Sequence, residues 1–258
     1  MATPLKLGIV TYNIAKDWTL EEIFKNLEEI EIHGVELRTT HAHGVEVGLS
    51  KEDREKVRKR FEDSPLELVQ LGSAFDFHTR SPEELRLSIE GAKEYAVLAH
   101  DVGASGIKVR PNGLPEGVPE EATLEQIGRS LREVGEFASG QGVEVRLEVH
   151  GKGTSRLPRI RKIMEIANHS AVVVNWNSNE SDLEDGGFDA GFDMVKDKIR
   201  HVHINELYKP NYPYRRLFER LHEIRYEGWC MAEIQGSSDP LRLLKFYRGL
   251  FLALQDAL

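Results

Sequence analysis

Short apolar runs alternate with longer helix-like segments from one end of the chain to the other. Several of these runs are nearly continuous and lack a residue-by-residue alternation, which is typical of strands in a parallel sheet covered by helices. Eight strands are expected, at Lys6–Tyr12, Gly34–Arg38, Leu66–Phe75, Gly106–Arg110, Val143–His150, Ala171–Asn177, Ile199–Asn205 and Trp229–Gln235.

Capping residues mark where helices begin between these runs. Two dipeptides place a cap residue before a proline at the first helical position, Ser81–Pro82 and Asp239–Pro240. Three further pairs have the spacing of a capping box, namely Thr19 with Glu22, Ser81 with Glu84 and Thr123 with Gln126.

Connections from strand to helix include two long ones, Pro111–Ala122 and Ser178–Ala190, whereas the connections from helix to strand are short. Long loops after the strands indicate that the functional face lies at the strands' C-terminal ends. Eight strand–helix units in 258 residues predict an α/β fold, a (β/α)₈ TIM barrel that forms one domain over residues 1–258. A doubly wound open sheet is the alternative, but the stretch Thr11–Ile14 lacks its glycine-rich fingerprint.

Four of the expected strands end in, or near, a residue that can bind a metal. These residues are Glu148, Asn177 (with Asn175 as the alternative), His203 and Glu233. The C-terminal ends of parallel barrel strands meet at the mouth, so we expect these side chains to converge there. Two carboxylates, one imidazole and one amide oxygen suit a divalent cation such as Mn²⁺, Mg²⁺, Co²⁺ or Zn²⁺.

Other polar side chains stand at or near the same ends and are candidates for substrate contact. His150 lies two residues after Glu148, so both side chains point to one face. Asn175 offers an amide to substrate hydroxyls, and Arg110 and Lys152 could meet an anionic group. Spacing does not settle whether His201 or His203 binds the metal, although His203 is nearer the strand's end. The substrate candidates are Glu36, His78, Arg110, His150, Lys152 and Asn175.

Composition and charge limit the kinds of molecule that the protein is expected to bind. The net charge is −9, from 34 basic and 43 acidic residues, and no basic stripe stands out, which argues against a nucleic-acid partner. Cys230 is the only cysteine, so no internal disulfide forms. The start of the chain has no signal-peptide pattern and no apolar run would span a bilayer. We therefore expect a cytoplasmic protein with no membrane partner; a homo-oligomer is left open.

The chain resembles the xylose isomerase-like TIM barrels, the sugar phosphate isomerase/epimerase group, over nearly its whole length. The resemblance rests on the segments KLGIVTY, HGVELR, VRLEVHG, VVNWNSN, IRHVHINEL and WCMAEIQG. In that family the ends of strands five to eight supply Glu, Asp, His and Glu to a divalent metal, which implies Glu148, Asn177, His203 and Glu233 here. Asn177 replaces the usual Asp, so the site loses one negative charge.

The resemblance implies a metal-dependent isomerase or epimerase of a keto sugar or related polyol. Glu148 and Glu233 would remove and return a proton through a metal-stabilised ene-diolate, while His78, His150, Glu36 and Arg110 position hydroxyls. A lyase or dehydratase that eliminates β to the carbonyl is one alternative. A non-catalytic sugar-binding barrel, with Asn177 as a sign of lost chemistry, is a second, and an endonuclease fits this acidic chain least.

Overall fold

The computed structural model describes residues 4–256. Its strands are Lys6–Val10 (β1), Gly34–Arg38 (β2), Glu67–Asp76 (β3), Gly106–Arg110 (β4), Glu144–Glu148 (β5), Val172–Asn177 (β6), Ile199–Ile204 (β7) and Trp229–Ala232 (β8). Its α-helices are Leu20–Ile30 (α1), Lys51–Glu62 (α2), Pro82–Val102 (α3), Glu120–Gly140 (α4), Leu157–Ala167 (α5), Phe188–Val195 (α6), Tyr214–Glu223 (α7) and Pro240–Ala253 (α8). Two short 3₁₀ helices, Glu180–Leu183 (η1) and Lys196–Lys198 (η2), flank α6.

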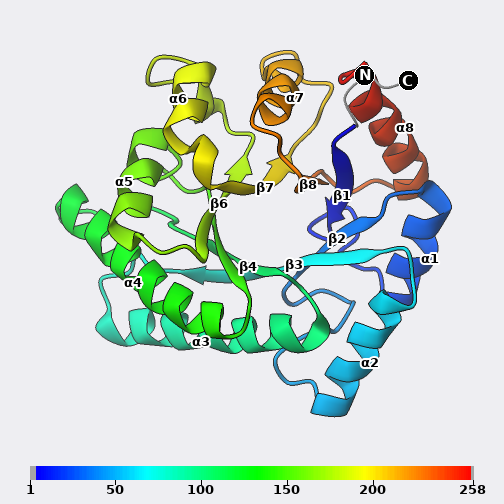
Figure 1. Ribbon diagram of the computed structural model, residues 1–258, viewed down its shortest axis with the longest axis horizontal. Helices are drawn as coiled ribbons and strands as arrows, with labels where there is room; N and C mark the ends of the chain where they lie inside the picture. Colours follow the sequence, from blue (N-terminus) through cyan, green and yellow to red (C-terminus); the bar gives the residue numbers. More distant parts are fainter. Residues whose placement is uncertain (1–3, 257–258) are drawn as a thin grey trace.

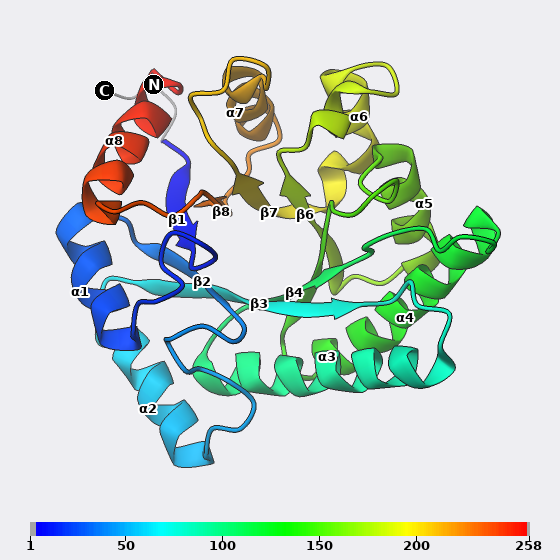
Figure 2. The ribbon, with the colours of Figure 1, turned by 180° about the vertical axis from the view of Figure 1, so that it is seen from behind.

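The strands close into a parallel barrel in chain order, because β1 pairs with β2 on one side and with β8 on the other. Leu7 stands opposite Cys230 at the closing seam. The helices form a ring around the strands, seen from one side in Figure 1 and from behind in Figure 2. The predicted single-domain (β/α)₈ barrel is confirmed, and the open sheet is excluded. Among the helices of residues 4–256, none is long and apolar enough to cross a membrane.

Apolar side chains pack in two separate clusters. The large one fills the layer between strands and helices and includes Phe24 and Trp176, both fully buried. The small one lies apart from it and comprises Val10, Val69, Trp229 and Met231. Much of the remaining buried surface on the strands is polar or charged, namely Glu36, Gln70, Lys108, Arg146, Glu148, Asn175, Asn177, His201 and His203. Buried polar groups need partners, so electrostatic contacts must hold this part of the barrel together.

Helix starts agree with the capping residues except at one place. Thr19 and Glu22 form a complete capping box, and the side chains of Ser81 and Asp239 each accept a backbone N–H of the helix that follows. The predicted box at Ser81 is half formed, because the Glu84 side chain accepts from the Thr79 hydroxyl instead. The cap predicted at Thr123 is wrong. Helix α4 starts at Glu120, after Pro119, so Thr123 lies inside the first turn, where its side chain is buried and caps nothing.

The connection between β6 and α6 is tied to the barrel by a buried carboxyl. Asp182 accepts hydrogen bonds from Tyr212 Oη at 2.6 Å and from the backbone N–H of Asn179 at 3.0 Å. Trp176 of β6 donates to the same Tyr212 oxygen at 3.1 Å. Burial raises the pKa of the Asp182 carboxyl to about 8, although both hydrogen bonds oppose the shift. This network holds the long loop that follows Asn177.

Gly8 lies at a close approach between β1 and its two neighbouring strands. A Cβ there would lie 2.6 Å from Met231 Sδ and 2.7 Å from the Gly34 carbonyl oxygen. We expect Gly8→Ala to lower the free energy of unfolding by about 1–3 kcal/mol, as overpacking does. The control is Gly249→Ala in α8, where no atom lies within 4 Å of the added carbon and the helix should gain up to about 1 kcal/mol. Urea unfolding measures both, and equal stability of the two variants would contradict the prediction.

Asp182 also predicts a pH dependence. Its folded pKa lies above the ordinary value of 3.8, so folding favours the protonated carboxyl. The stabilisation present at low pH is therefore lost as the pH rises from about 4 to about 8, by at most about 1.4 kcal/mol per pH unit. Asp182→Asn should make this decline shallower in urea unfolding across that range, whereas Asp63→Asn, at the exposed end of α2, should keep the wild-type slope. Parallel curves for all three proteins would rule the effect out.

Candidate active site

The structure brings the four predicted strand-end residues to one place. Glu148 of β5 stands beside Asn175 of β6, and Asn177 stands beside His203 of β7. Strand β8 ends at Ala232, one residue short of Glu233, whose backbone N–H still donates to the Ile204 carbonyl. Consecutive parallel strands in this register carry their end residues to a common point at the C-terminal face.

His203 lies at the centre of this group. Its Nδ1 is 3.3 Å from Glu148 Oε1 and 3.4 Å from Glu233 Oε2. The Asn177 amide nitrogen donates to the same Glu148 oxygen at 3.3 Å. Within the described part of the chain, neither Asn177 Oδ1 nor His203 Nδ1 has a hydrogen-bond partner, although both are buried. Two carboxylate oxygens, a ring nitrogen and an amide oxygen therefore lie close together, and each has a lone pair that could bind a metal ion.

Glu36 fixes the opposite edge of the His203 ring. Glu36 Oε2 lies 2.7 Å from His203 Nε2 and 3.2 Å from His201 Nε2, and it accepts a hydrogen bond from Gln70 at 2.6 Å. When a carboxylate accepts a hydrogen bond from Nε2–H of a histidine, Nδ1 is the nitrogen that remains able to bind a metal ion. Asn175 lies beside the same ring, with its amide nitrogen 3.2 Å from Nε2. Glu36 and Asn175 have no exposed surface, so their positions fit holding His203 better than contacting a substrate.

His203 is strongly polarised by its acidic neighbours. Burial by itself would lower the pKa of the ring, but the carboxylates of Glu36, Glu233 and Glu148 outweigh burial and raise the pKa well above its ordinary value. Burial lowers the pKa of the adjacent His201 to about 3, with Arg146 adding to the shift. His201 is therefore neutral at physiological pH, whereas the acidic neighbours of His203 favour its protonated form.

Lys108 of β4 is the main site residue that the sequence interpretation missed. Its ammonium nitrogen donates to Glu148 Oε2 at 2.8 Å, and both side chains are almost completely buried. Burial would raise the pKa of Glu148, yet Lys108 and His203 hold that pKa well below its ordinary value. The signal was present in the segment GIKVR: a lysine inside a buried strand is costly unless it is paired.

Arg146 is not the partner of Glu148. Its guanidinium forms an ion pair with Glu144 at 2.9 Å and donates to Ser105 Oγ, also at 2.9 Å. It reaches Gln70 Oε1 at 3.3 Å as well. Arg146 therefore stabilises the barrel interior one layer below the site, and Lys108 supplies the counter-charge for Glu148.

A chain of polar contacts runs outward from the site across the mouth. His150 Nδ1 is 3.0 Å from the side-chain oxygen of Asn112, whose amide donates to Asp76 Oδ2 at 2.9 Å. Asp76 Oδ1 is 3.1 Å from His78 Nδ1, and Arg110 approaches Asp76 Oδ2 at 3.8 Å. The predicted residues His78, Arg110 and His150 thus belong to one network. Lys152 lies beyond it, on the wall of a cavity of about 620 Å³ that also includes His78.

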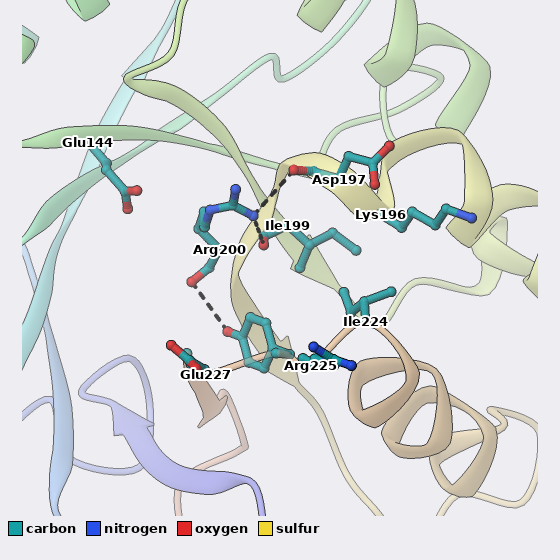
Figure 3. Close-up of a pocket in the computed structure, with 10 residues that line it drawn as sticks. Glu144, Lys196, Asp197, Ile199, Arg200, Ile224, Arg225 and Glu227 are labelled. Atoms are coloured by element: carbon teal, nitrogen blue, oxygen red, sulfur yellow. Dashed lines mark hydrogen bonds between the residues drawn. The ribbon is translucent and has the colours of Figure 1, made fainter.

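A second cavity, of about 470 Å³, opens at the other end of the barrel. Figure 3 shows Glu144 at the start of β5 and Arg200 near the start of β7 on its walls, with Glu227 preceding β8. The Tyr226 hydroxyl donates to the Arg200 carbonyl at 3.3 Å. In residues 4–256, both groups of three or more side chains that could hold a metal contain His203, and neither includes a residue of this cavity. The candidate metal ligands therefore lie at the C-terminal face, the end at which TIM barrels carry their active sites.

Comparison with solved structures supports the fold assignment. The apo form of 3-keto-D-glucoside 4-epimerase YcjR from E. coli has a TM-score of 0.81 at 17% identity, covering 96% of this chain and 99% of that one. The probable 3-DHS dehydratase AsbF from Bacillus anthracis has a TM-score of 0.74 at 16% identity, with 96% and 98% covered. IolI with a zinc atom bound has a TM-score of 0.79 at 16% identity, with 97% and 98% covered. At these identities the likeness shows the fold alone.

Sequence comparison places the chain in a family. A search of the curated proteins gave no match. The family model for the xylose isomerase-like TIM barrel, by contrast, matches residues 24–248, which is most of the chain and includes every candidate site residue. This chain belongs to the xylose isomerase-like TIM barrel family.

Proposed function

We propose that this protein is a metal-dependent isomerase or epimerase that moves a proton at the carbon beside the carbonyl of a keto sugar or related polyol. The observation that carries the proposal is the approach of two carboxylates, Glu148 and Glu233, to one nitrogen of His203, at 3.3 and 3.4 Å. A structural neighbour named as a 3-keto-D-glucoside 4-epimerase supports the class of reaction, and IolI, whose structure holds a zinc atom, supports a metal site.

The donor set fits a divalent cation. Glu148, Glu233 and His203 can each direct one ligand atom to a common point, with these atoms within 4.8 Å of one another. The buried Asn177 Oδ1 has no hydrogen-bond partner among the described residues and would be the fourth ligand. Mn²⁺, Mg²⁺, Co²⁺ and Zn²⁺ all accept such mixed oxygen and nitrogen ligands. A bound cation would act as a Lewis acid toward the sugar carbonyl and its neighbouring hydroxyl.

The two glutamates would exchange the proton with the substrate from different environments. Glu148 is buried and paired with Lys108, so it stays ionised and fixed in position. Glu233 is 18% exposed and follows the end of β8 directly. One carboxylate, in its ionised form, would remove the proton from one face of the reacting carbon, and the other, carrying a proton taken up from solvent, would deliver it to the opposite face. This division of roles suits epimerisation.

Side chains at the mouth would orient the sugar. The His150 ring is held in place by its hydrogen bond to Asn112, which donates in turn to Asp76, and the His78 ring lies 3.1 Å from Asp76. Arg110 donates to the Ala74 carbonyl at 2.8 Å and lies beside the same network. Preorganised donors of this kind reduce the entropy lost on binding. Glu36 and Asn175 would act indirectly, through the His203 ring.

Elimination is the second candidate reaction, and one contact favours it. His150 is tied to Asn112 through Nδ1, and its Nε2 forms no hydrogen bond within residues 4–256, so this nitrogen is available to a leaving group near the reacting carbon. A structural neighbour is named as a probable dehydratase. Product mass separates the two reactions: an isobaric product supports isomerisation or epimerisation, and loss of water supports elimination.

The glutamates can be tested by proton exchange. We expect the wild-type protein, supplied with Mn²⁺ or Co²⁺, to incorporate solvent deuterium beside the carbonyl of at least one sugar in a panel of ketopentoses and ketohexoses in D₂O. Glu148→Gln and Glu233→Gln should each slow this exchange by about 10²–10⁴-fold, the usual contribution of a general base. Nuclear magnetic resonance follows the exchange directly.

The matched control is Glu227→Gln, at the opposite end of the barrel beside β8. It should exchange at the wild-type rate. Full activity in both active-site variants would sink the proposed roles, and absence of exchange in the wild type across the panel would favour a non-catalytic sugar-binding barrel.

Metal affinity is the second test. Asn177→Asp adds an anionic ligand, and Lys108→Met frees Glu148 Oε2 and removes a neighbouring positive charge. Each change should strengthen Mn²⁺ binding by about tenfold or more, since a nearby unit charge is worth more than about 1.4 kcal/mol at this depth. Calorimetric titration of chelator-treated protein measures the affinity.

Exposed positions supply the controls, Asn168→Asp at the end of α5 and Lys162→Met within it. Both should bind Mn²⁺ as the wild type does. Lys108→Met leaves the buried Glu148 carboxylate without its counter-charge, which should lower the free energy of unfolding by about 3–5 kcal/mol. Circular dichroism shows whether this variant folds. If it does not fold, Asn177→Asp alone provides the test. Unchanged affinity in Asn177→Asp would show that the cation is not held by this residue set.

A further inference from the structure

A large cavity adjoins the candidate active site on the C-terminal face. Its volume is about 620 Å³, and its walls come from the loops that follow β3, β4 and β5. His78 and Arg80 line it from the first loop, Leu114 from the second and Lys152 from the third. This volume lies within the range of about 300–1,000 Å³ in which proteins bind whole small molecules.

The cavity is linked to His150 through the chain of polar contacts described above. His150 lies two residues after Glu148 and forms the first link of that chain, and His78, on the cavity wall, is the last. A substrate held at His203 would extend past His150 to reach the cavity.

The cavity walls are held in place. A β-bridge joins Gly113 to Lys152 and so links the second loop to the third. Gly151 has φ +95°, and a Cβ there would lie 2.6 Å from the backbone of Asn112. Only glycine allows this close approach of the two loops without strain. The cavity is therefore a preformed site that loses little entropy when a ligand enters.

The polar groups of the cavity match a hydroxyl-rich ring. Its carboxylates are already engaged, Asp76 with His78 and Asn112, and Glu84 with the Thr79 hydroxyl. Within residues 4–256, Lys152 has no carboxylate within 4.0 Å, and Arg80 donates only to the Glu116 carbonyl, at 3.5 Å.

Leu114 and Pro115 add an aliphatic surface to the same cavity. Free donors beside an apolar wall suit the hydroxyls and the aliphatic face of a sugar ring. A phosphate group could pair with the side chains of Arg80 and Lys152, but it is too small to fill the cavity, most of which would remain occupied by water.

We propose that the cavity binds a second sugar ring, so that the substrate is a keto sugar bearing a glycosyl group. This inference rests on the proposed function, because it takes the reacting keto sugar to lie at Glu148, His203 and Glu233. His78, Arg80 and Lys152 would donate to the hydroxyls of the distal ring, and Leu114 would pack against its face. The glycosyl group would then raise kcat/KM by binding energy used away from the reacting carbon.

The test compares sugars that differ only in the distal group. Deuterium exchange is measured with the Mn²⁺-loaded protein on four sugars: D-fructose, D-fructose 6-phosphate, isomaltulose and maltulose. Isomaltulose is D-fructose with a glucosyl ring on O6, and maltulose is D-fructose with a glucosyl ring on O4. We expect kcat/KM for at least one disaccharide to exceed that for D-fructose by about tenfold or more. Lys152→Trp, which fills the cavity, should abolish this ratio, and Arg80→Ala should reduce it. Lys162→Trp, exposed on α5, is the control and should keep it.

Each other outcome overturns a defined part of the inference. Equal kcat/KM for D-fructose and both disaccharides would overturn the second-ring site and leave the proposed function standing. A preference for D-fructose 6-phosphate that is lost in Arg80→Ala would assign the cavity to an anionic group instead.

Calorimetry covers the case in which no sugar exchanges. Disaccharide binding about tenfold tighter than D-fructose binding, and lost in Lys152→Trp, would uphold the cavity site while the proposed reaction fails. Absence of binding by all four sugars would overturn both.

Discussion

The ion pair between Lys108 and Glu148 is the interaction on which the active-site end of this barrel depends. Both side chains are almost completely buried, and their charged atoms are 2.8 Å apart. Removing two charges from water costs several kcal/mol each, and only close pairing with further hydrogen bonds offsets that cost. Asn177 supplies one such bond to the other oxygen of Glu148. The pair therefore joins β4 to β5 and fixes which oxygen of Glu148 faces His203.

A second carboxylate organises the opposite side of the same ring. Glu36 connects β2 with β7 across the barrel through His203 and His201, while Gln70 donates to it from β3. The His203 ring thus lies between Glu36 on its Nε2 side and the pair Glu148 and Glu233 on its Nδ1 side. Such an arrangement leaves little freedom to the ring, so adaptation to different substrates falls to the loops at the mouth. This separation of a rigid centre from variable surroundings is common in TIM barrels.

The sequence allowed the barrel and the converging strand ends to be predicted, because both follow from local patterns. Each of the four expected metal ligands stands at or next to the end of a buried strand, namely Glu148, Asn177, His203 and Glu233. The register of neighbouring parallel strands then brings these residues together. The role of Lys108 could not be assigned in the same way, since its partner lies 40 residues away and only the register of β4 against β5 brings them together.

Helix α4 and the cavity beyond His150 show the same limit. Thr123 has a good capping spacing, yet a proline and two glutamates before it start the helix one turn earlier. The cavity depends on how three loops meet, through contacts such as the bridge between Gly113 and Lys152. Loop geometry of this kind is set by long-range packing, which no pattern of hydrophobic and polar positions contains.

The ionic interior has a thermodynamic consequence for the whole molecule. Unfolding exposes Lys108, Arg146, Glu36 and Glu148 to water, along with buried amides and imidazoles. Hydration of polar surface lowers the heat capacity of unfolding, whereas hydration of apolar surface raises it. A barrel with this interior therefore has a flatter dependence of stability on temperature than one filled with aliphatic layers. The desolvation penalty of its buried charges also falls on heating, so these ion pairs contribute most when the protein is warm.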